Sequence, residues 1–203
     1  PSKGWGVRDG ALIHEQGGGG GDLITKRTYG DFEFAFEWKV APGANSGVMY
    51  GVRESSQPSY FTGPEYQILD GARGDMRLAA GGLYALYPTR PSLIRPAGRW
   101  NQGRIRRVGN RIEHWLNGGL VVECEIGSDD WNSRVANSKF GKWKDFGKVP
   151  VGHLCLQDHG NEVWYRNLKA RALDPVPSRY EEPVVLFDGK NTDAFSAFIK
   201  GEG

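Results

Sequence analysis

The segment from Asp31 to Val40 alternates between apolar and polar residues without a break. Successive side chains of a β-strand point to opposite faces, so the apolar positions of this segment share one face and the polar positions share the other. The apolar face carries Phe32, Phe34, Phe36, Trp38 and Val40. The pattern predicts a strand that buries one face in a hydrophobic core and leaves the other in water.

Further segments show strand-like patterns, and their number and spacing predict a two-sheet antiparallel sandwich. They are residues 47–53, 65–69, 82–87, 100–108, 111–116, 120–126, 151–157 and 163–172. Gly109-Asn110 and Asn117-Gly118 separate three of these segments, and such pairs favour tight hairpin turns. Residues 100–126 are therefore predicted to form a meander of three strands. One short helix is expected at 128–138, with Ser128 as its N-cap.

The composition is that of a globular chain, with 38% hydrophobic and 25% charged residues. The net charge of +2 gives no electrostatic signature of nucleic-acid binding, so we expect no nucleic-acid partner. No apolar run approaches the roughly 18 residues that a membrane-spanning helix needs, so we expect no membrane span. We expect a secreted or periplasmic location, with any export signal lying outside this sequence.

Three local features add further expectations. Cys124 and Cys155 lie in predicted strands without metal-ligand spacing, which favours two buried free thiols over a disulfide between strands. The glycines at 17–21 form either an ordinary loose loop or a connection whose backbone approaches a ligand. Residues 174–183 are rich in proline and charge, which predicts a linker and a domain boundary.

Strand parity turns several polar side chains away from the predicted core. Glu65 and Gln67 share one face of their strand, and Gln157 and His159 share one side of theirs. Such positions are either ordinary solvent-facing residues or the floor of a ligand cleft.

Several short strings resemble the 3-keto-disaccharide hydrolase family, and they occur in that family's order within residues 5–173. The strings are Gly20-Gly21-Asp22-Leu23, Tyr29-Gly30-Asp31-Phe32, Asn45-Ser46-Gly47, Gly63-Pro64-Glu65-Tyr66-Gln67, Trp100-Asn101, Glu113-His114-Trp115-Leu116-Asn117-Gly118, Ser138-Lys139-Phe140 and Leu156-Gln157-Asp158-His159-Gly160. The resemblance implies a concanavalin A-like jelly roll, which agrees with the strand pattern. It also implies cleavage of glycosides whose C3 hydroxyl has been oxidised to a ketone.

The resemblance bears on the domain organisation as well. Domains of the family usually open with a Leu-Phe-Asp-Gly-Lys strand, and here that string stands at 186–190, after the linker. We expect a jelly-roll domain at 1–173, with 184–203 beginning a second similar domain in tandem. The alternative is that this late segment supplies a missing strand to the first sandwich.

The implied chemistry needs a base, an acid and a group that polarises the ketone. A C3 ketone acidifies the C2 hydrogen, so a modest base can remove it while the C1 substituent leaves; water then adds to the unsaturated sugar. His159 is the candidate base, and Glu65 is the candidate acid or a ligand of a divalent metal. The sequence has no spaced ligand motif that establishes such a metal, so metal use stays open. His114 is either a cleft residue, and then the next catalytic candidate, or a structural histidine, because it shares parity with apolar neighbours.

The remaining candidates are polar or aromatic residues that suit a sugar ligand. For substrate binding they are Gln67, Tyr84, Asn101, Lys139, Gln157, Trp164 and Arg166, with Tyr87 as a further stacking candidate. Asp158 has the opposite parity to His159 and is expected to fix its loop.

Two other kinds of function compete with this reading. A non-catalytic carbohydrate-binding module would use the same cleft without chemistry, and an interaction domain of a multidomain surface protein would use neither. A retaining glucanase is disfavoured, because its mechanism needs two carboxylates about 5 Å apart, whereas Glu33 and Glu37 look like surface residues.

Overall fold

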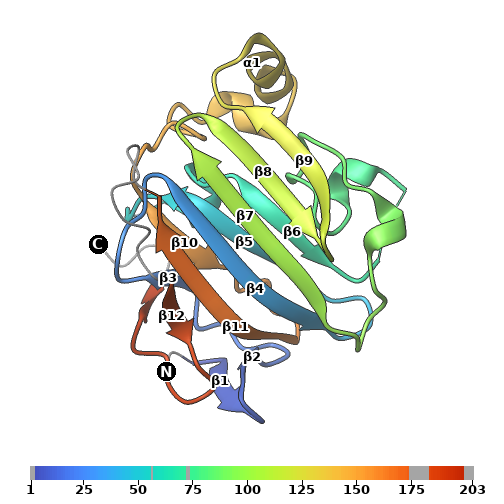
Figure 1. Ribbon diagram of the computed structural model, residues 1–203, viewed down its shortest axis with the longest axis vertical. Coiled ribbons are helices and arrows are strands. Elements are labelled where there is room, and N and C mark those ends of the chain that lie inside the picture. Colours follow the sequence, from blue (N-terminus) through green and yellow to red (C-terminus); the bar gives the residue numbers. More distant parts are fainter. Residues whose placement is uncertain (1–2, 56, 72–73, 174–182, 199–203) are drawn as a thin grey trace.

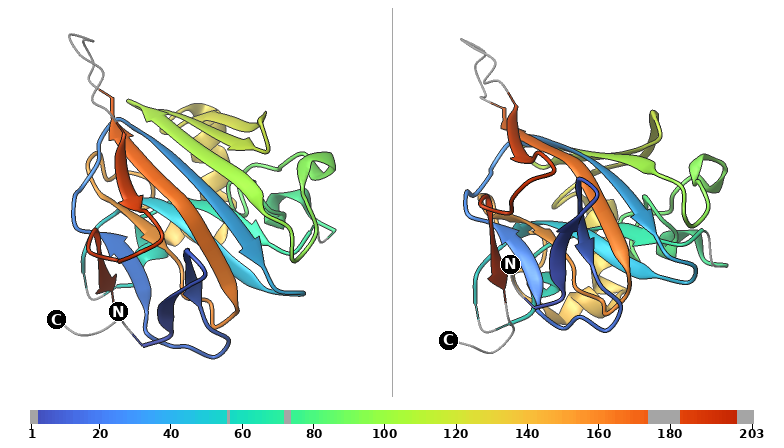
Figure 2. Two further views of the ribbon diagram at one scale, coloured as in Figure 1. Left: turned by 60° about the horizontal axis from the view of Figure 1, so that its bottom comes forward. Right: turned by 90° about the horizontal axis from the view of Figure 1, so that it is seen from below.

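The computed structural model describes residues 3–55, 57–71, 74–173 and 183–198, and it stacks two antiparallel sheets face to face (Figures 1 and 2). In spatial order the larger sheet consists of β1 (Trp5–Arg8), β2 (Ala11–His14), β11 (Val163–Ala172), β4 (Phe32–Val40), β7 (Asn101–Val108), β8 (Arg111–Leu116) and β9 (Gly119–Glu125), with β12 (Val184–Phe187) also paired to β11. The smaller sheet consists of β13 (Phe195–Phe198), β3 (Asp22–Thr25), β10 (His153–Leu156), β5 (Asn45–Val52) and β6 (Glu65–Leu69). The predicted two-sheet sandwich is therefore confirmed.

Helices are few and short in the described part of the chain. They are α1 (Asp129–Ala136) and the 3₁₀ segments η1 (Ser59–Phe61), η2 (Met76–Leu78), η3 (Pro91–Leu93) and η4 (Lys139–Lys142). The predicted N-cap is present, because the Ser128 hydroxyl accepts a hydrogen bond from the Trp131 N–H. None of these helices combines the length and apolar character that a membrane crossing requires.

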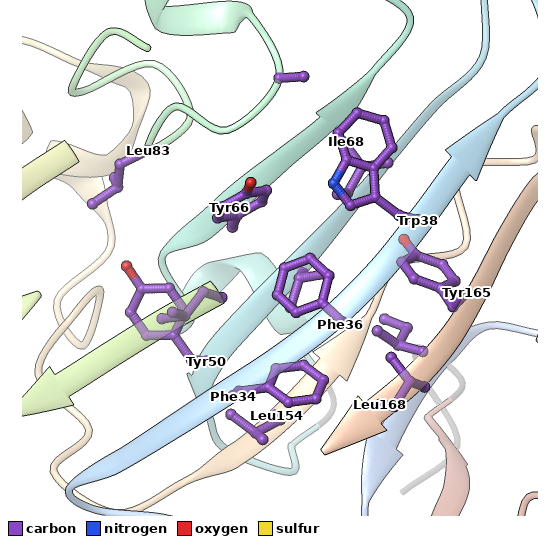
Figure 3. Close-up of a cluster of buried hydrophobic side chains, with 14 of the residues drawn as sticks. Phe34, Phe36, Trp38, Tyr50, Tyr66, Ile68, Leu83, Leu154, Tyr165 and Leu168 are labelled. Atoms are coloured by element: carbon purple, nitrogen blue, oxygen red, sulfur yellow. The ribbon is translucent and has the colours of Figure 1, made fainter. Parts of the chain in front are cut away.

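The core lies between the sheets and uses the side chains that the alternating pattern selected. All five apolar side chains of β4 are at most 2% exposed, and they meet aromatic residues of β5, β6 and β11. Figure 3 shows Phe34, Phe36 and Trp38 directed toward Tyr50, Tyr66 and Tyr165. Burying each such side chain contributes about 1.5–3 kcal/mol, so this aromatic layer holds the two sheets together.

Most of the predicted elements are confirmed, and one is wrong. β7, β8 and β9 form the expected meander, and Cys124 and Cys155 are buried free thiols. Residues 82–87 form no strand, because the backbone reverses between Leu83 and Tyr87, with Ala85 in a left-handed conformation. The strands β1, β2 and β3 were not expected, since their four-residue segments are too short to show a clear alternation.

The late segment belongs to both sheets in this structure. β12 pairs with Leu168–Ala170 of β11, beyond the part of that strand that pairs with β2, and β13 pairs with β3 at the edge of the smaller sheet. This is the arrangement of the alternative in which 184–203 completes the first sandwich. The expected linker lies almost wholly outside the described residues, and the division into domains stays a prediction.

Replacing Phe187 by alanine tests whether this segment stabilises the sandwich. The Phe187 ring is 2% exposed within the main core, so Phe187→Ala is expected to lower the free energy of unfolding by about 3 kcal/mol. Val185 lies on the same strand and is 49% exposed, so Val185→Ala should cost less than about 0.5 kcal/mol. Equal small losses in chemical denaturation of the two variants would show that β12 adds nothing to this domain.

Candidate active site

A pocket of about 240 Å³ lies on the outer face of the smaller sheet, on the side away from the core. Its lining is Asn45, Tyr60, Glu65, Gln67, Tyr84, Lys139, Phe140, Gln157 and His159. Strand parity explains the position, because Tyr66 and Ile68 of β6 point into the core and Glu65 and Gln67 point the other way. Six of the residues predicted from the sequence therefore meet in one pocket.

Glu65 lies flat across the neighbouring strand and is only 7% exposed. On β5, Met49 pairs with Glu65 and Gly47 pairs with Gln67. A side chain at position 47 would collide with the Glu65 side chain and displace it, so the glycine is needed for Glu65 to lie there. Burial raises the pKa of Glu65 to about 8, and the charge of Lys139 opposes that shift. Glu65 therefore carries its proton at neutral pH.

Three amide side chains supply hydrogen-bond acceptors to the same pocket. The side-chain oxygens of Asn45, Gln67 and Gln157 are buried and accept no hydrogen bond within the described part of the chain. A buried acceptor without a donor costs about 1–3 kcal/mol, so these oxygens are prepared for a ligand that donates. Sugar hydroxyl groups are such donors.

Lys139 and Tyr84 form a wall of the pocket that comes from loops and not from the strands of the sheet. The Lys139 ammonium lies 4.5 Å from the centre of the Tyr84 ring, which holds it by a cation–π contact. Lys139 comes from η4 and Tyr84 from the turn after Gly82, so loops cover the strands that bear Glu65 and Gln67.

Hydrogen bonds of Asp158 fix the loop that carries His159. Asp158 accepts bonds from the Gly21 N–H at 3.0 Å and the Gly160 N–H at 2.9 Å, which confirms its expected loop-fixing role. The Asp158 N–H in turn donates to Asp22 Oδ1 at 2.8 Å. The carboxylates of Asp22 and Asp158 thus join the two segments through backbone N–H groups, and His159 is the next residue after Asp158.

Asp22 also binds the residue next to Tyr60, which lines the pocket. Ser59 Oγ donates to Asp22 Oδ2, so η1 and the His159 loop are attached to one carboxyl group. Burial raises the pKa of Asp22, while its hydrogen bonds to Ser59 and Asp158 oppose the shift.

The glycine run packs closely against its surroundings. His14 lies under it with Nε2 2.9 Å from Asp158 Oδ1, and its Nδ1 is 2.9 Å from the Asn161 carbonyl oxygen. A side chain at Gly18 would meet the His14 ring, and one at Gly20 would collide with the Lys3 backbone. Gly18 and Gly20 therefore allow close packing against His14 and Lys3, whereas Gly17, Gly19 and Gly21 have positive φ values that favour glycine. This packing is not that of a loose loop, and contact of the run with a ligand stays a prediction.

His114 lies in the core and outside the pocket. Its ring is fully buried, with Nε2 3.0 Å from the Tyr50 hydroxyl and Nδ1 3.2 Å from the Gly81 carbonyl. Burial lowers its pKa to about 3, so the ring is neutral. Of the two roles that the sequence allowed for His114, the structure supports that of a structural histidine.

Four other candidates also lie away from the pocket. Asn101 is buried and fixes turns, accepting from the Arg95 N–H and from Asn117 Nδ2. Tyr87 packs on Trp131 within the core cluster. Trp164 and Arg166 do lie together, but on the outer face of the larger sheet, where Arg166 pairs with Glu37 at 2.7 Å.

Sequence reasoning missed four residues that shape the site: Asn45, Tyr60 and Phe140, which line the pocket, and Asp22. Tyr60 carried no signal, since η1 is a single turn between loops. Asn45 shares strand parity with Gly47 and could have been found by that rule, and Asp22 stands in one of the resembling strings. Among the described residues, no three His, Cys, Asp or Glu side chains gather as a metal site, so the cation suggested for Glu65 stays an open prediction.

The protonated state of Glu65 has a consequence for stability. Its pKa rises from 4.5 to about 8 on folding, so the folded state keeps a proton that the unfolded chain loses. Stability should therefore fall as the pH rises from about 4.5 to about 8, at about 1.4 kcal/mol per pH unit at most. Glu65→Gln should lack this slope and be more stable at pH 7 by up to about 3 kcal/mol.

Chemical denaturation at pH 5, 7 and 8.5 measures this effect, and Glu125→Gln serves as control because Glu125 is an exposed residue of β9. Parallel slopes in Glu65→Gln and the parent protein would mean that Glu65 does not retain its proton.

Comparisons with known proteins agree with this architecture. The family model described as a 3-keto-alpha-glucoside-1,2-lyase-like domain matches residues 1–171. A 3-keto-disaccharide hydrolase from Bacteroides thetaiotaomicron is 31% identical, over 86% of this chain and 71% of that protein. The solved structure of a glycosyl hydrolase candidate from Parabacteroides distasonis is 33% identical, with a TM-score of 0.77 over 85% of both chains.

A Bacillus subtilis protein with a galectin-like fold, 12% identical with a TM-score of 0.52 over 83% of this chain and 86% of that one, shares the fold alone. The match over nearly the whole sandwich, together with the order of the quoted strings, shows that this chain belongs to the family of 3-keto-alpha-glucoside-1,2-lyase-like domains.

Proposed function

We propose that this protein cleaves 3-keto-glycosides by elimination followed by hydration, in the pocket on the smaller sheet. The observation that carries the proposal is a buried carboxyl group, Glu65, whose pKa of about 8 keeps it protonated beside an exposed histidine, His159. A proton donor and a proton acceptor in one small pocket are what this elimination requires. The name of the Bacteroides relative and the 1,2-lyase description of the family support the same substrate class.

The elimination assigns one task to each charged or titratable group of the pocket. His159 takes the proton from C2, and the electrons of that C–H bond form an enolate with the C3 carbonyl. Expulsion of the C1 oxygen then makes a C1–C2 double bond, and the Glu65 carboxyl group gives its proton to the departing oxygen. The Lys139 ammonium stabilises the negative enolate oxygen, as a preorganised cation does in an oxyanion site.

Hydration completes the reaction without an oxidant or reductant. Water adds its oxygen to C1 of the unsaturated ketone, giving its proton to the Glu65 carboxylate, and C2 takes back the proton that His159 holds. The products are a 3-keto sugar and the free alcohol, so the sum of the two steps is a hydrolysis. The amide oxygens of Gln67 and Gln157 accept hydrogen bonds from the sugar hydroxyls and hold the ring in place.

A carbohydrate-binding module without chemistry is the weaker alternative. Binding alone gives no reason to bury a glutamic acid, because an exposed carboxylate accepts hydroxyl donors equally well and avoids the cost of burial. The proposal includes the expected secreted or periplasmic location, which cell fractionation would test.

Removal of the His159 ring should separate catalysis from folding. His159 is exposed, so His159→Ala should leave the melting temperature nearly unchanged while turnover of a 3-keto-glucoside falls by roughly 10². His153→Ala is the matched control, since His153 lies on β10 outside the pocket and its Nδ1 is 2.6 Å from the Thr25 carbonyl oxygen. Full turnover in His159→Ala would exclude it as the base.

A further inference from the structure

A second hollow of about 330 Å³ lies beside the active-site pocket. The residues that matter to its chemistry are Arg53, Phe61, Lys142, Trp143, Lys144 and Asp145. The elimination described above does not use any of them.

The two hollows share a wall made of aromatic side chains. Tyr60 and Phe61 are consecutive in η1, and Tyr60 lines the pocket while Phe61 lines the second hollow. At η4, Phe140 lines the active-site pocket and Trp143 lines the second hollow. The Trp143 ring centre is 5.5 Å from that of Tyr60 and 5.4 Å from that of Phe140, so one layer of rings separates the hollows.

The size of the pocket makes a neighbouring site necessary for a larger substrate. Ligand sites usually have about 300–1,000 Å³, and this pocket has about 240 Å³. It therefore suits one sugar ring, and the second unit of a disaccharide must lie outside it. Glu65, which would give its proton to the departing oxygen, lies in the pocket, so that unit must begin at the pocket's rim.

The second hollow is positively charged and partly aromatic. Arg53 is compensated by Asp145 at 2.9 Å, whereas Lys142 and Lys144 are exposed and make no ion pair with any described residue. Trp143 is half-buried and stacks on Phe61, with ring centres 4.4 Å apart, and the Lys142 ammonium lies 5.9 Å from the centre of the same ring. A rigid aromatic surface and a cation therefore lie side by side in this hollow. The charge predicts a ligand with an anionic group.

We propose that the hollow at Trp143 binds the leaving group of the substrate and favours one that bears a carboxylate, such as a uronic acid. This inference rests on the proposed cleavage of 3-keto-glycosides. It assigns Trp143 to the sugar ring of the leaving group, and Lys142 and Lys144 to its carboxylate.

The test compares kcat/KM for three substrates that differ only in the leaving group: methyl 3-keto-glucoside, 3-keto-glucosyl-glucose and 3-keto-glucosyl-glucuronate. In Trp143→Ala, kcat/KM of both disaccharides should fall about tenfold more than that of the methyl glycoside. In the double variant Lys142→Gln/Lys144→Gln, kcat/KM for the glucuronate substrate should fall about threefold to tenfold more than kcat/KM for the neutral disaccharide. Added salt should remove the preference of the parent protein for the glucuronate substrate. Lys148→Gln is the control, because Lys148 is exposed on the same loop and lines neither hollow.

Equal losses for all three substrates in Trp143→Ala would overturn the subsite, since a defect transmitted through Tyr60 would affect every substrate alike. An unchanged preference in the double lysine variant would overturn the choice of a carboxylate. If the parent protein turns over no 3-keto-glucoside, the proposed function fails, and calorimetry with unoxidised glucosyl-glucuronate still decides the subsite. Weaker binding by Trp143→Ala than by the parent protein would then support it, and equal or absent binding would overturn it.

Discussion

Hydrogen bonds that join Gly21 and Asp22 to Asp158 fix the candidate active site. Asp22 accepts from the Asp158 N–H and Asp158 accepts from the Gly21 N–H, so the start of β3 and the end of β10 hold each other. Hydrogen bonds to charged groups contribute about 1.5–3 kcal/mol each, which is enough to keep a loop in one conformation. Because Asp22 also binds Ser59, the same carboxyl group sets the place of Tyr60 on one wall and His159 on the other.

A short series of hydrogen-bonded polar groups links the core to the loop that carries His159. Ser46 Oγ donates to the Gln157 carbonyl oxygen at 2.8 Å and lies 2.9 Å from the Tyr165 hydroxyl. Tyr165 belongs to the larger sheet and Ser46 to the smaller, so the packing of the two sheets determines where the His159 loop begins. The position of the His159 loop therefore depends on the close packing of the core.

Strand parity predicted the faces of the strands well, and its failures share one physical cause. The rule found Glu65, Gln67, Gln157 and His159, because each lies on or beside a strand whose other face is apolar. Parity does not say which sheet a strand joins. Trp164 and Arg166 obey the same rule and point outward from the opposite sheet, so they were wrongly grouped with the pocket.

Residues whose roles depend on distant partners could not be assigned from the sequence alone. His114 has the parity of a core residue, but only the fold brings Tyr50 and the Gly81 carbonyl to its two nitrogens. Tyr60 lies on a single turn whose position depends on Ser59 and Asp22. Such roles follow from contacts between segments tens of residues apart, which local periodicity does not contain.

The outer face of the larger sheet differs from the proposed active site in how its carboxylates are paired. On that face Glu33 is bound by Arg171 at 2.9 Å and Glu37 is bound by Arg166 at 2.7 Å. These two carboxylates therefore have cationic partners. No arginine pairs with Glu65 among the described residues, and its burial over Gly47 favours the neutral acid instead. In the proposed mechanism Glu65 acts as an acid because it has no guanidinium partner among the described residues and because Gly47 leaves room for its burial.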